Sequence, residues 1–288
     1  MQDPMAAGQW ETLKISAIAP GVVECRLHRP DKRNALSLRM WDEIRDFFGA
    51  ISTDGSIRVV LLTGEGKLFC SGVDMEAFTA VGAPEGDIGH TALKIRSVGK
   101  HWQDAFTNLE KCGKVVIACV HGACIGAGVE LIAAADIRFC SADAVFGLKE
   151  VDVGLAADVG GLQRFPRLVG NQSLVRELVF SGRNLSASEA LPFGLVSRIC
   201  PSREALMQEA VELAKVIASK SPIALLGAKT LLNYSRDHSV DESLEYAITW
   251  NQSMLQSREV AGAAMAQLSK KPATFPDLPS FPRVSSKL

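Results

Sequence analysis

The sequence lacks the features that would mark a membrane, secreted or nucleic-acid-binding protein. It contains no run near the roughly 18 apolar residues of a transmembrane helix, and its start lacks the basic and apolar regions of a signal peptide. The formal net charge is -1 and aromatic residues make up only 6% of the chain. No general attraction to nucleic acid or to an anionic membrane is therefore expected, and we predict a soluble protein that is not secreted.

The seven cysteines form no CxxC pair and none of the cysteine and histidine spacings that are typical of zinc sites. They are scattered singly, at positions 25, 70, 112, 119, 124, 140 and 200. We therefore expect reduced and mostly buried thiols. With 47% hydrophobic and 22% charged residues, the composition is that of an ordinary globular enzyme with one large domain or a domain plus an appendage.

The chain from Trp10 to about Cys200 alternates short β-rich runs with longer amphipathic segments, which predicts an α/β protein. Strands are expected within residues 22–30, 57–66, 114–123 and 136–147. Helices are expected at 36–52, where apolar residues recur at spacings of three and four, within 126–136, and at 172–182, ending at Gly182.

After Pro201 the strand signals stop, and helices are expected to follow one another to about residue 271. Ser221 and Pro222 form a typical cap and first turn, and Ser239 to Glu242 matches a capping box. Alanine-rich helices with little strand between them cannot easily form a core alone. We therefore expect this region to pack on the first part of the chain or on another subunit.

These patterns predict four segments along the chain. Residues 1–9 are expected to be a flexible N-terminus that opens with a cloning remnant, 10–202 the core, 203–271 a helical region that packs on the core or on another subunit, and 272–288 an extended tail. The tail ends in Ser286, Lys287 and Leu288. This tripeptide is a peroxisomal address read by an import receptor. We therefore predict that receptor as a partner, and a peroxisome or a related organelle as the location.

Two glycine-rich segments each follow a predicted strand: KLFCSGVDM at 67–75 and GACIGAG at 122–128. Neither matches a nucleotide-binding motif, because GxxxxGK[ST] is absent and the GxGxxG order is not met. Considered alone, each segment is a tight packing turn between a strand and a helix. Two such turns that converge can instead direct two backbone N–H groups at one oxygen atom, which is the geometry of an oxyanion hole.

Three acids lie in glycine-rich or apolar surroundings: Glu130, Glu150 and Asp158. A carboxylate is costly to hold there unless it has a partner or a chemical task, so the three are candidates for proton transfer. Each also has a structural alternative. Glu130 can cap or pair inside its helix, and Asp158 can cap the helix that follows it. Glu150 can pair with Lys149 or Arg164.

Neighbouring polar residues are expected to be structural. Asp152 alternates with Glu150 among valines and should face solvent or pair with a cation. Asp74 follows the first turn and should hold the loop through its backbone. His121 precedes the second turn and should pack or hydrogen-bond there.

In combination these motifs resemble the enoyl-CoA hydratase/isomerase, or crotonase, superfamily. The resemblance rests on HGACIGAGVELIAAADIRF, KLFCSGVDM, RPDKRNALS at 29–37 and the segment 146–171, and it covers residues 10 to about 275. Within the superfamily, KEVDVGLAADVG is most similar to the Δ3,5-Δ2,4-dienoyl-CoA isomerases. The resemblance implies a crotonase-like spiral of ββα repeats with a C-terminal helical trimerisation region, assembled as a homotrimer or a dimer of trimers.

The resemblance also implies an acyl-CoA thioester as substrate, with its oxygen held by the backbone N–H groups of Val73 and Ala127. Ala127 stands where glycine is usual in the family, a change that a backbone donor tolerates. The implied substrate-binding residues are Arg33, Ala35, Ser71, Gly72, Val73, Asp74 and Gly126. Coenzyme A belongs to the substrate, and no metal or redox cofactor is required. Residues 76–106 are expected to shape the acyl pocket.

For the implied reaction, Glu150 is predicted to be the base at C2 and Asp158 the acid at C6, with Glu130 tuning the pair or orienting a water. The alternative is an enoyl-CoA hydratase that uses Glu130 and Glu150. Glu130 departs from the aspartate that is more typical of dienoyl isomerases, whereas Asp158 departs from the glycine usual in hydratases. A third class, RNA binding by a crotonase relative, has little support in the charge or the aromatic content.

Overall fold

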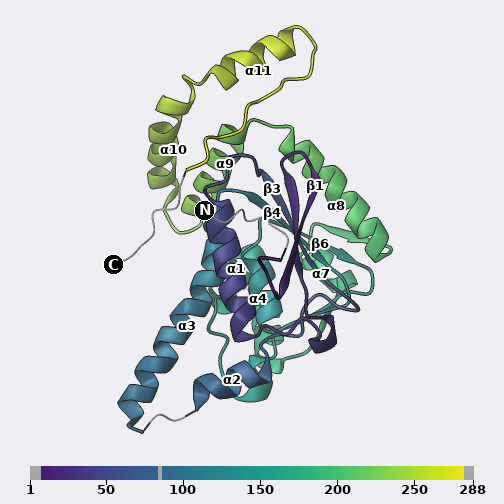
Figure 1. The fold of residues 1–288 in the computed structure, drawn as a ribbon, viewed down its shortest axis with the longest axis vertical. Coiled ribbons are helices and arrows are strands. Elements are labelled where there is room, and N and C mark those ends of the chain that lie inside the picture. Colours follow the sequence, from purple (N-terminus) through teal and green to yellow (C-terminus); the bar gives the residue numbers. More distant parts are fainter. Residues whose placement is uncertain (1–7, 84–85, 282–288) are drawn as a thin grey trace.

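The structure is a computed structural model that describes residues 8–83 and 86–281. Its strands form two sheets (Figure 1), a larger one in the order β1-β2-β3-β4-β6-β9 and a smaller one in the order β5-β7-β8. Only the pairs β1 with β2 and β7 with β8 are antiparallel within these sheets. The strands are β1 Leu13–Ala19, β2 Val22–Leu27, β3 Val59–Gly64, β4 Val115–Val120, β5 Ala123–Ile125, β6 Ile137–Ser141, β7 Val145–Gly147, β8 Leu185–Ser186 and β9 Arg198–Cys200.

Helices connect and cover these strands, so the predicted α/β class is confirmed. The α-helices of the described residues are α1 Leu38–Ile51, α2 Met75–Gly82, α3 Ile88–Lys111, α4 Ala127–Ala133, α5 Gly161–Leu168, α6 Gln172–Ser181, α7 Ala187–Phe193, α8 Arg203–Ala218, α9 Pro222–Ser235, α10 Val240–Met254 and α11 Arg258–Leu268. Two short 3-10 helices are η1 Pro30–Lys32 and η2 Glu150–Val153.

The large sheet has helices on both faces, as Figure 1 shows, with α8 on one side and α1 and α3 on the other. Alternate residues of β3 point to opposite faces. Val60 and Leu62 belong to the core that contains the apolar residues of α1 and α3. Val59 and Leu61 pack instead with the alanine-rich face of α8. The continuous apolar run of β3 therefore reflects a strand that is buried on both faces.

The single strand expected at 136–147 is wrong, because this segment forms two strands in different sheets. β6 pairs with β4, and β7 pairs with β5. Between them the Ala144 N–H donates to the carbonyl of Ser141 at 3.0 Å, and the Ser141 hydroxyl donates to Asp143. Small polar residues therefore close a turn inside what looks like one β-rich run.

The helices predicted after residue 201 are present, and both predicted caps are confirmed. The Ser221 hydroxyl accepts from Ala224, and Ser239 with Glu242 forms a capping box. α9 docks on the core through Lys229, whose Nζ lies 2.8 Å from Asp136. In contrast, α10 and α11 contain no buried residue and project beyond the sheet (Figure 1). We call α9, α10 and α11 the C-terminal arm.

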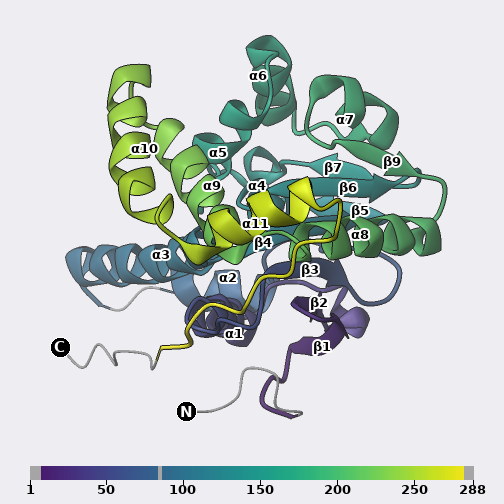
Figure 2. The same cartoon turned by 90° about the horizontal axis from the view of Figure 1, so that it is seen from above.

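The described part of the tail forms no helix or strand, and it returns to the core. The Arg58 guanidinium donates to the carbonyl of Phe275 at 2.9 Å, and the Phe281 N–H donates to the carbonyl of Thr53 at 3.0 Å. Figure 2 shows this segment running from α11 back toward α1. The predicted cloning remnant at the start and the terminal Ser286, Lys287 and Leu288 lie outside the described residues.

All seven cysteines are buried and free, as predicted from their scattered positions. Burial raises the pKa of Cys70 to about 12, so the thiol stays protonated at neutral pH. In the part of the chain that the structure describes, no helix is both long enough and apolar enough to span a bilayer.

Candidate active site

The first glycine-rich turn is held against the loop that precedes α1. The Leu36 N–H donates to the carbonyl of Gly72 at 2.8 Å, and the Asp74 N–H donates to the carbonyl of Leu36 at 3.0 Å. This short parallel pairing uses the carbonyl of Gly72 and the N–H of Asp74, the residues on either side of Val73. Among the described residues, the Val73 N–H donates to no acceptor and is therefore free to meet a ligand oxygen.

The second glycine-rich turn contacts the first through their glycines. Gly126 has a φ of 53°, in the left-handed region, and its N–H donates to the carbonyl of Gly147 at 2.7 Å. Helix α4 begins at the next residue, Ala127, whose N–H has no acceptor in the described chain. A Cβ atom on Gly72 would lie only 4.0 Å from the Ala127 nitrogen and 3.2 Å from the carbonyl oxygen of Ile125. The predicted convergence of the two turns is therefore observed.

Glu150 lies beside the second turn, at the start of η2. Its Oε1 is 3.1 Å from the position that a Cβ atom on Gly126 would occupy. The carboxyl group is thus adjacent to the residue that precedes the free N–H of Ala127. Burial, and then the negative charge of Asp158, raise the pKa of Glu150 above its ordinary value.

The structural alternative for Glu150, an ion pair, is wrong. Lys149 donates to the carbonyl of Gly182 and lies 3.7 Å from Asp152 instead. Arg164 pairs with Glu110. Both predicted cations are therefore engaged elsewhere, and the Glu150 carboxyl group has no ion-pair partner in the described chain.

Glu130 projects from α4 and is only 2% exposed. Its Oε1 accepts a hydrogen bond of 2.7 Å from the Gly161 N–H, at the first residue of α5. Glu130 therefore bonds to the first turn of a different helix, and the predicted cap or pair inside its own helix is wrong. Burial, followed by repulsion from Glu150 and Asp158, raises the pKa of Glu130 to about 8. The group is mostly protonated at neutral pH.

Asp158 lies in the segment between η2 and α5 and is the most exposed of the three acids. Its backbone carbonyl accepts from the side-chain Nε2 of Gln103 at 2.8 Å. The N-cap of α5 is Gly160, without any side-chain cap, so the predicted alternative of Asp158 as a helix cap is wrong. Desolvation raises the pKa of Asp158 above its ordinary value.

The three acids form one electrostatic cluster. Glu150 and Asp158 both raise the pKa of Glu130, and Asp158 raises that of Glu150. Repulsion of this kind opposes ionisation of all three groups together. Protons would therefore leave the cluster in coupled steps that belong to the group as a whole.

The loop at 33–35 supports the first turn through its backbone. Arg33 and Asn34 both have left-handed φ values, 53° and 52°, and the Ser71 N–H donates to the carbonyl of Arg33 at 3.1 Å. Asn34 is fully buried, and its Nδ2 donates to the carbonyls of Glu65, Leu68 and Phe69. Asn34 is not among the residues predicted from the sequence, although asparagine tolerates the left-handed region well and is typical of such turns.

The remaining polar residues near the site have the structural roles predicted for them. The Asp74 carboxylate caps α2 by accepting from Glu76 at 3.0 Å and pairs with Arg29 at 2.8 Å. His121 is buried, and its Nε2 lies 3.0 Å from the carbonyl oxygen of Gly66. Asp152 is exposed and near Lys149.

Stability should depend on pH through Glu130. Its folded pKa of about 8 exceeds the ordinary 4.5, so its contribution is fully present below pH 4.5 and is lost as the pH rises toward 8. In Glu130→Gln, the amide that replaces the carboxyl group can still accept from Gly161 but cannot ionise. From pH 4.5 to 7, the unfolding free energy of this variant should therefore rise relative to the parent by on the order of 3 kcal/mol. Denaturant titrations at several pH values test this, and a constant difference would contradict it.

The fold and the site together define a class: an α/β protein in which two backbone N–H groups lie beside a cluster of carboxyl groups. Comparisons with known proteins agree. The model of the family "Enoyl-CoA hydratase/isomerase" matches residues 17–277. A solved enoyl-CoA hydratase from Bacillus anthracis superposes with a TM-score of 0.82 and 30% identity, over 92% of this chain and 99% of that one. The chain belongs to the enoyl-CoA hydratase/isomerase family.

Relatives with a stated enzyme activity are similar over most of the chain. The mitochondrial Δ3,5-Δ2,4-dienoyl-CoA isomerase of Rattus norvegicus is 48% identical over 264 residues, which are 91% of this chain and 81% of the relative. The peroxisomal Δ3,5-Δ2,4-dienoyl-CoA isomerase of Arabidopsis thaliana is 40% identical over 255 residues, 88% of this chain and 91% of the relative. A Thermobifida fusca structure in complex with acetoacetyl-CoA superposes with a TM-score of 0.75 and 30% identity, over 85% of this chain and 94% of that one.

Proposed function

We propose that this enzyme is a Δ3,5-Δ2,4-dienoyl-CoA isomerase, which converts a 3,5-dienoyl-CoA into a 2,4-dienoyl-CoA during the oxidation of unsaturated fatty acids. The identity of 48% to the rat isomerase, over 91% of the chain, carries this conclusion. The cluster of three carboxyl groups supports it, since the reaction consists of proton transfers.

The proposed binding site holds the thioester oxygen between the N–H groups of Val73 and Ala127. Two donors aimed at one oxygen stabilise the negative charge that develops when a C2 proton is removed. Support comes from the contact between the two turns and from the absence of any protein acceptor for these two groups in the described chain. We assign substrate contacts to the same loops, at Arg33, Ala35, Ser71, Gly72, Val73, Asp74 and Gly126.

In the proposed mechanism, Glu150 removes a proton from C2. The C2–H bond breaks, an O–H bond forms on Glu150, and the electron pair moves into the dienolate. Asp158 then donates its proton to C6, which leaves the double bonds at C2 and C4. Because C2 and C6 lie several ångströms apart, two differently placed acids suit the reaction better than one. The raised pKa of Asp158 favours a group that carries a proton to donate.

Glu130 has a supporting role in this proposal. Protonated at neutral pH and bonded to Gly161, it adds no second negative charge beside Glu150 and keeps the segment that carries Asp158 in place. After each turnover Glu150 holds an extra proton and Asp158 lacks one. A proton must therefore return to Asp158 before the next cycle.

Ultraviolet absorbance of the reaction catalysed by the unmodified full-length protein tests the proposal. With a 3,5-dienoyl-CoA as substrate, we expect growth of the band of a 2,4-dienoyl thioester, in which the diene is conjugated with the carbonyl. The matched control is a 2-enoyl-CoA, whose hydration would remove its conjugated band. Rapid hydration without any dienoyl isomerisation would overturn the proposal.

That second outcome corresponds to the alternative function, an enoyl-CoA hydratase. The solved Bacillus anthracis structure is an enoyl-CoA hydratase, and the two acids predicted for hydration, Glu130 and Glu150, are both present here. Asp158 distinguishes the two functions, because a third acid has a task in C6 protonation and none in water addition.

We further propose that the enzyme is a homotrimer or a dimer of trimers assembled through the C-terminal arm. α10 and α11 bury no residue in the single chain, and apolar side chains such as Leu244, Ile248 and Leu255 are 60%, 66% and 65% exposed. Such patches commonly mark subunit contacts. Light scattering that gives the mass of one chain would contradict this assembly.

The proposed compartment is an organelle of fatty-acid oxidation. The rat relative is mitochondrial and the Arabidopsis relative is peroxisomal. Localisation to the peroxisome in particular stays a prediction, and it rests on Ser286, Lys287 and Leu288. A fluorescent fusion that retains these three residues should reach peroxisomes, and one without them should not.

A further inference from the structure

Two polar contacts hold the short segment that carries Asp158. Glu130 accepts the N–H of Gly161 at 2.7 Å. Gln103 donates its Nε2 to the carbonyl of Asp158 at 2.8 Å. Among the described residues, no other side chain donates to the Asp158 backbone. Gln103 is therefore the direct attachment of this residue to α3.

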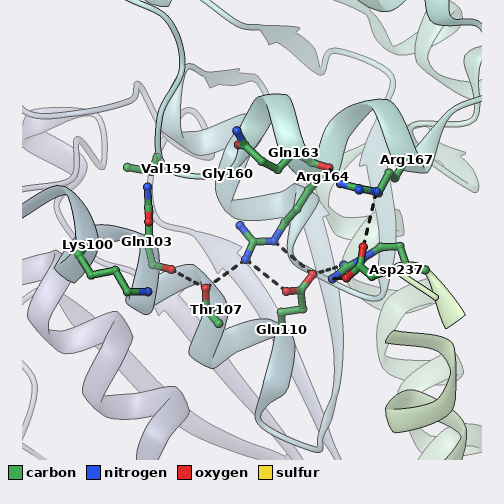
Figure 3. Close-up of a pocket in the computed structure, with 11 residues that line it drawn as sticks. Lys100, Gln103, Thr107, Glu110, Val159, Gly160, Gln163, Arg164, Arg167 and Asp237 are labelled. Carbon is green, nitrogen blue, oxygen red and sulfur yellow. Dashed lines mark hydrogen bonds and ion pairs between the residues drawn. The ribbon is translucent and has the colours of Figure 1, made fainter. Parts of the chain in front are cut away.

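Gln103 lines a cavity of about 350 Å³ between α3, α5 and the segment that follows α9. Figure 3 shows its side chain extending toward Val159, while the guanidinium of Arg164 extends across the cavity toward Glu110. The other residues that line the cavity are mostly polar or charged. Val159 and Gly160, which follow Asp158 in the chain, also line this cavity, whereas Glu130 does not.

A network of polar contacts fixes the α3 surface from which Gln103 extends. Arg164 donates through Nη2 to the hydroxyl of Thr107 at 3.2 Å and pairs with Glu110 at 3.2 Å. Arg236 also pairs with Glu110. The Arg164 guanidinium fills the space beside Gly160, since a Cβ atom there would lie 2.0 Å from Nη1. Arg164 thus joins α5 to α3 close to the Asp158 segment.

We propose that Gln103 is a positioning residue for C6 protonation, because it sets the place of Asp158 through the carbonyl of that residue. The inference rests on the proposed isomerase function. A hydrogen bond to the backbone at Asp158 restricts the rotation of that peptide and hence the direction in which the carboxyl group leaves the chain. Glu150 is held separately, at the start of η2 beside Gly126. Gln103 therefore acts on the second proton transfer directly, whereas it reaches the first only through the charge of Asp158.

The experiment compares Gln103→Met, which keeps the size of the side chain but removes the donor, with Gln163→Met. Gln163 lines the same cavity, and its side chain makes no hydrogen bond in the described part of the structure. For each protein, isomerisation of a 3,5-dienoyl-CoA and exchange of the C2 hydrogen in deuterium oxide are measured. A second variant, Gln103→Glu, removes the donor while the residue stays polar.

We expect both Gln103 variants to lower kcat for isomerisation by about 10- to 100-fold, as misplacement of a reacting group does, with KM and C2 exchange preserved. Gln163→Met should match the parent. Equal isomerisation rates in the Gln103 variants and the control, or an equal loss of C2 exchange and isomerisation, would overturn the inference. A parent that shows no isomerisation would overturn the proposed function, a result distinct from an active parent with unaffected Gln103 variants.

Discussion

Asp158→Asn is expected to slow isomerisation by about 10²- to 10⁴-fold, the usual contribution of a general acid. Asparagine has nearly the same shape, and its backbone carbonyl can still accept from Gln103, but it has no acidic proton to give to C6. Removal of the C2 proton by Glu150 does not require Asp158. Deuterium should therefore still enter C2 from solvent, while the absorbance of the conjugated product grows slowly.

Asp152→Asn is the matched control, because Asp152 is an exposed acid in the neighbouring helix η2, where it lies near Lys149 and Gly182. Its isomerisation rate should equal that of the parent. Full activity in Asp158→Asn would mean that another group protonates C6. Hydration of a 2-enoyl-CoA that survives the same substitution would favour the hydratase function.

Glu150→Gln is expected to remove both measurable steps, with a loss of about 10²- to 10⁴-fold in C2 exchange and in isomerisation alike. The amide occupies the same position beside Gly126 but cannot accept the proton at neutral pH. Because the dienolate no longer forms, Asp158 has no carbanion to protonate. The pattern differs from that of Asp158→Asn, in which exchange persists.

Deuterium exchange followed by mass spectrometry distinguishes these two patterns directly. Retained C2 exchange in Glu150→Gln would assign the base to another residue, with Glu130 as the first candidate. A binding measurement with a non-reactive acyl-CoA provides the control, since the substitution leaves the two backbone donors unchanged and affinity should be preserved.

Much of the fold could be predicted because its signals are local. The spacing of apolar residues identified α1, and the long apolar runs identified β2, β3 and β4. The division of 136–147 into β6 and β7 could not be predicted from local pattern, because it depends on which distant strand each half joins. The same reason explains why β8, with two residues, gave no signal.

The acidic residues of the site could be predicted from the sequence, but the residues that hold them in place could not. Glu130, Glu150 and Asp158 stood out as carboxylates in apolar or glycine-rich surroundings, and the structure brings their charges within reach of one another. The contact of Gln103 with Asp158 spans 55 residues of sequence. A glutamine on a polar helix face looks like any solvated side chain, so only the folded arrangement reveals that contact.

The C-terminal arm is held on the core at its start, where Lys229 of α9 pairs with Asp136 and Asn233 donates to the carbonyl of Glu110, and the tail that follows it is held at Phe275 by Arg58. α10 and α11 therefore lie between two segments that are both bonded to the core, so they are not attached by one end alone. The junction of α10 and α11 is held as well, because the Ser221 hydroxyl at the start of α9 donates to Glu259 at the start of α11. These attachments hold the exposed apolar side chains of α10 in a nearly constant orientation. A neighbouring molecule would therefore bind a preformed apolar surface.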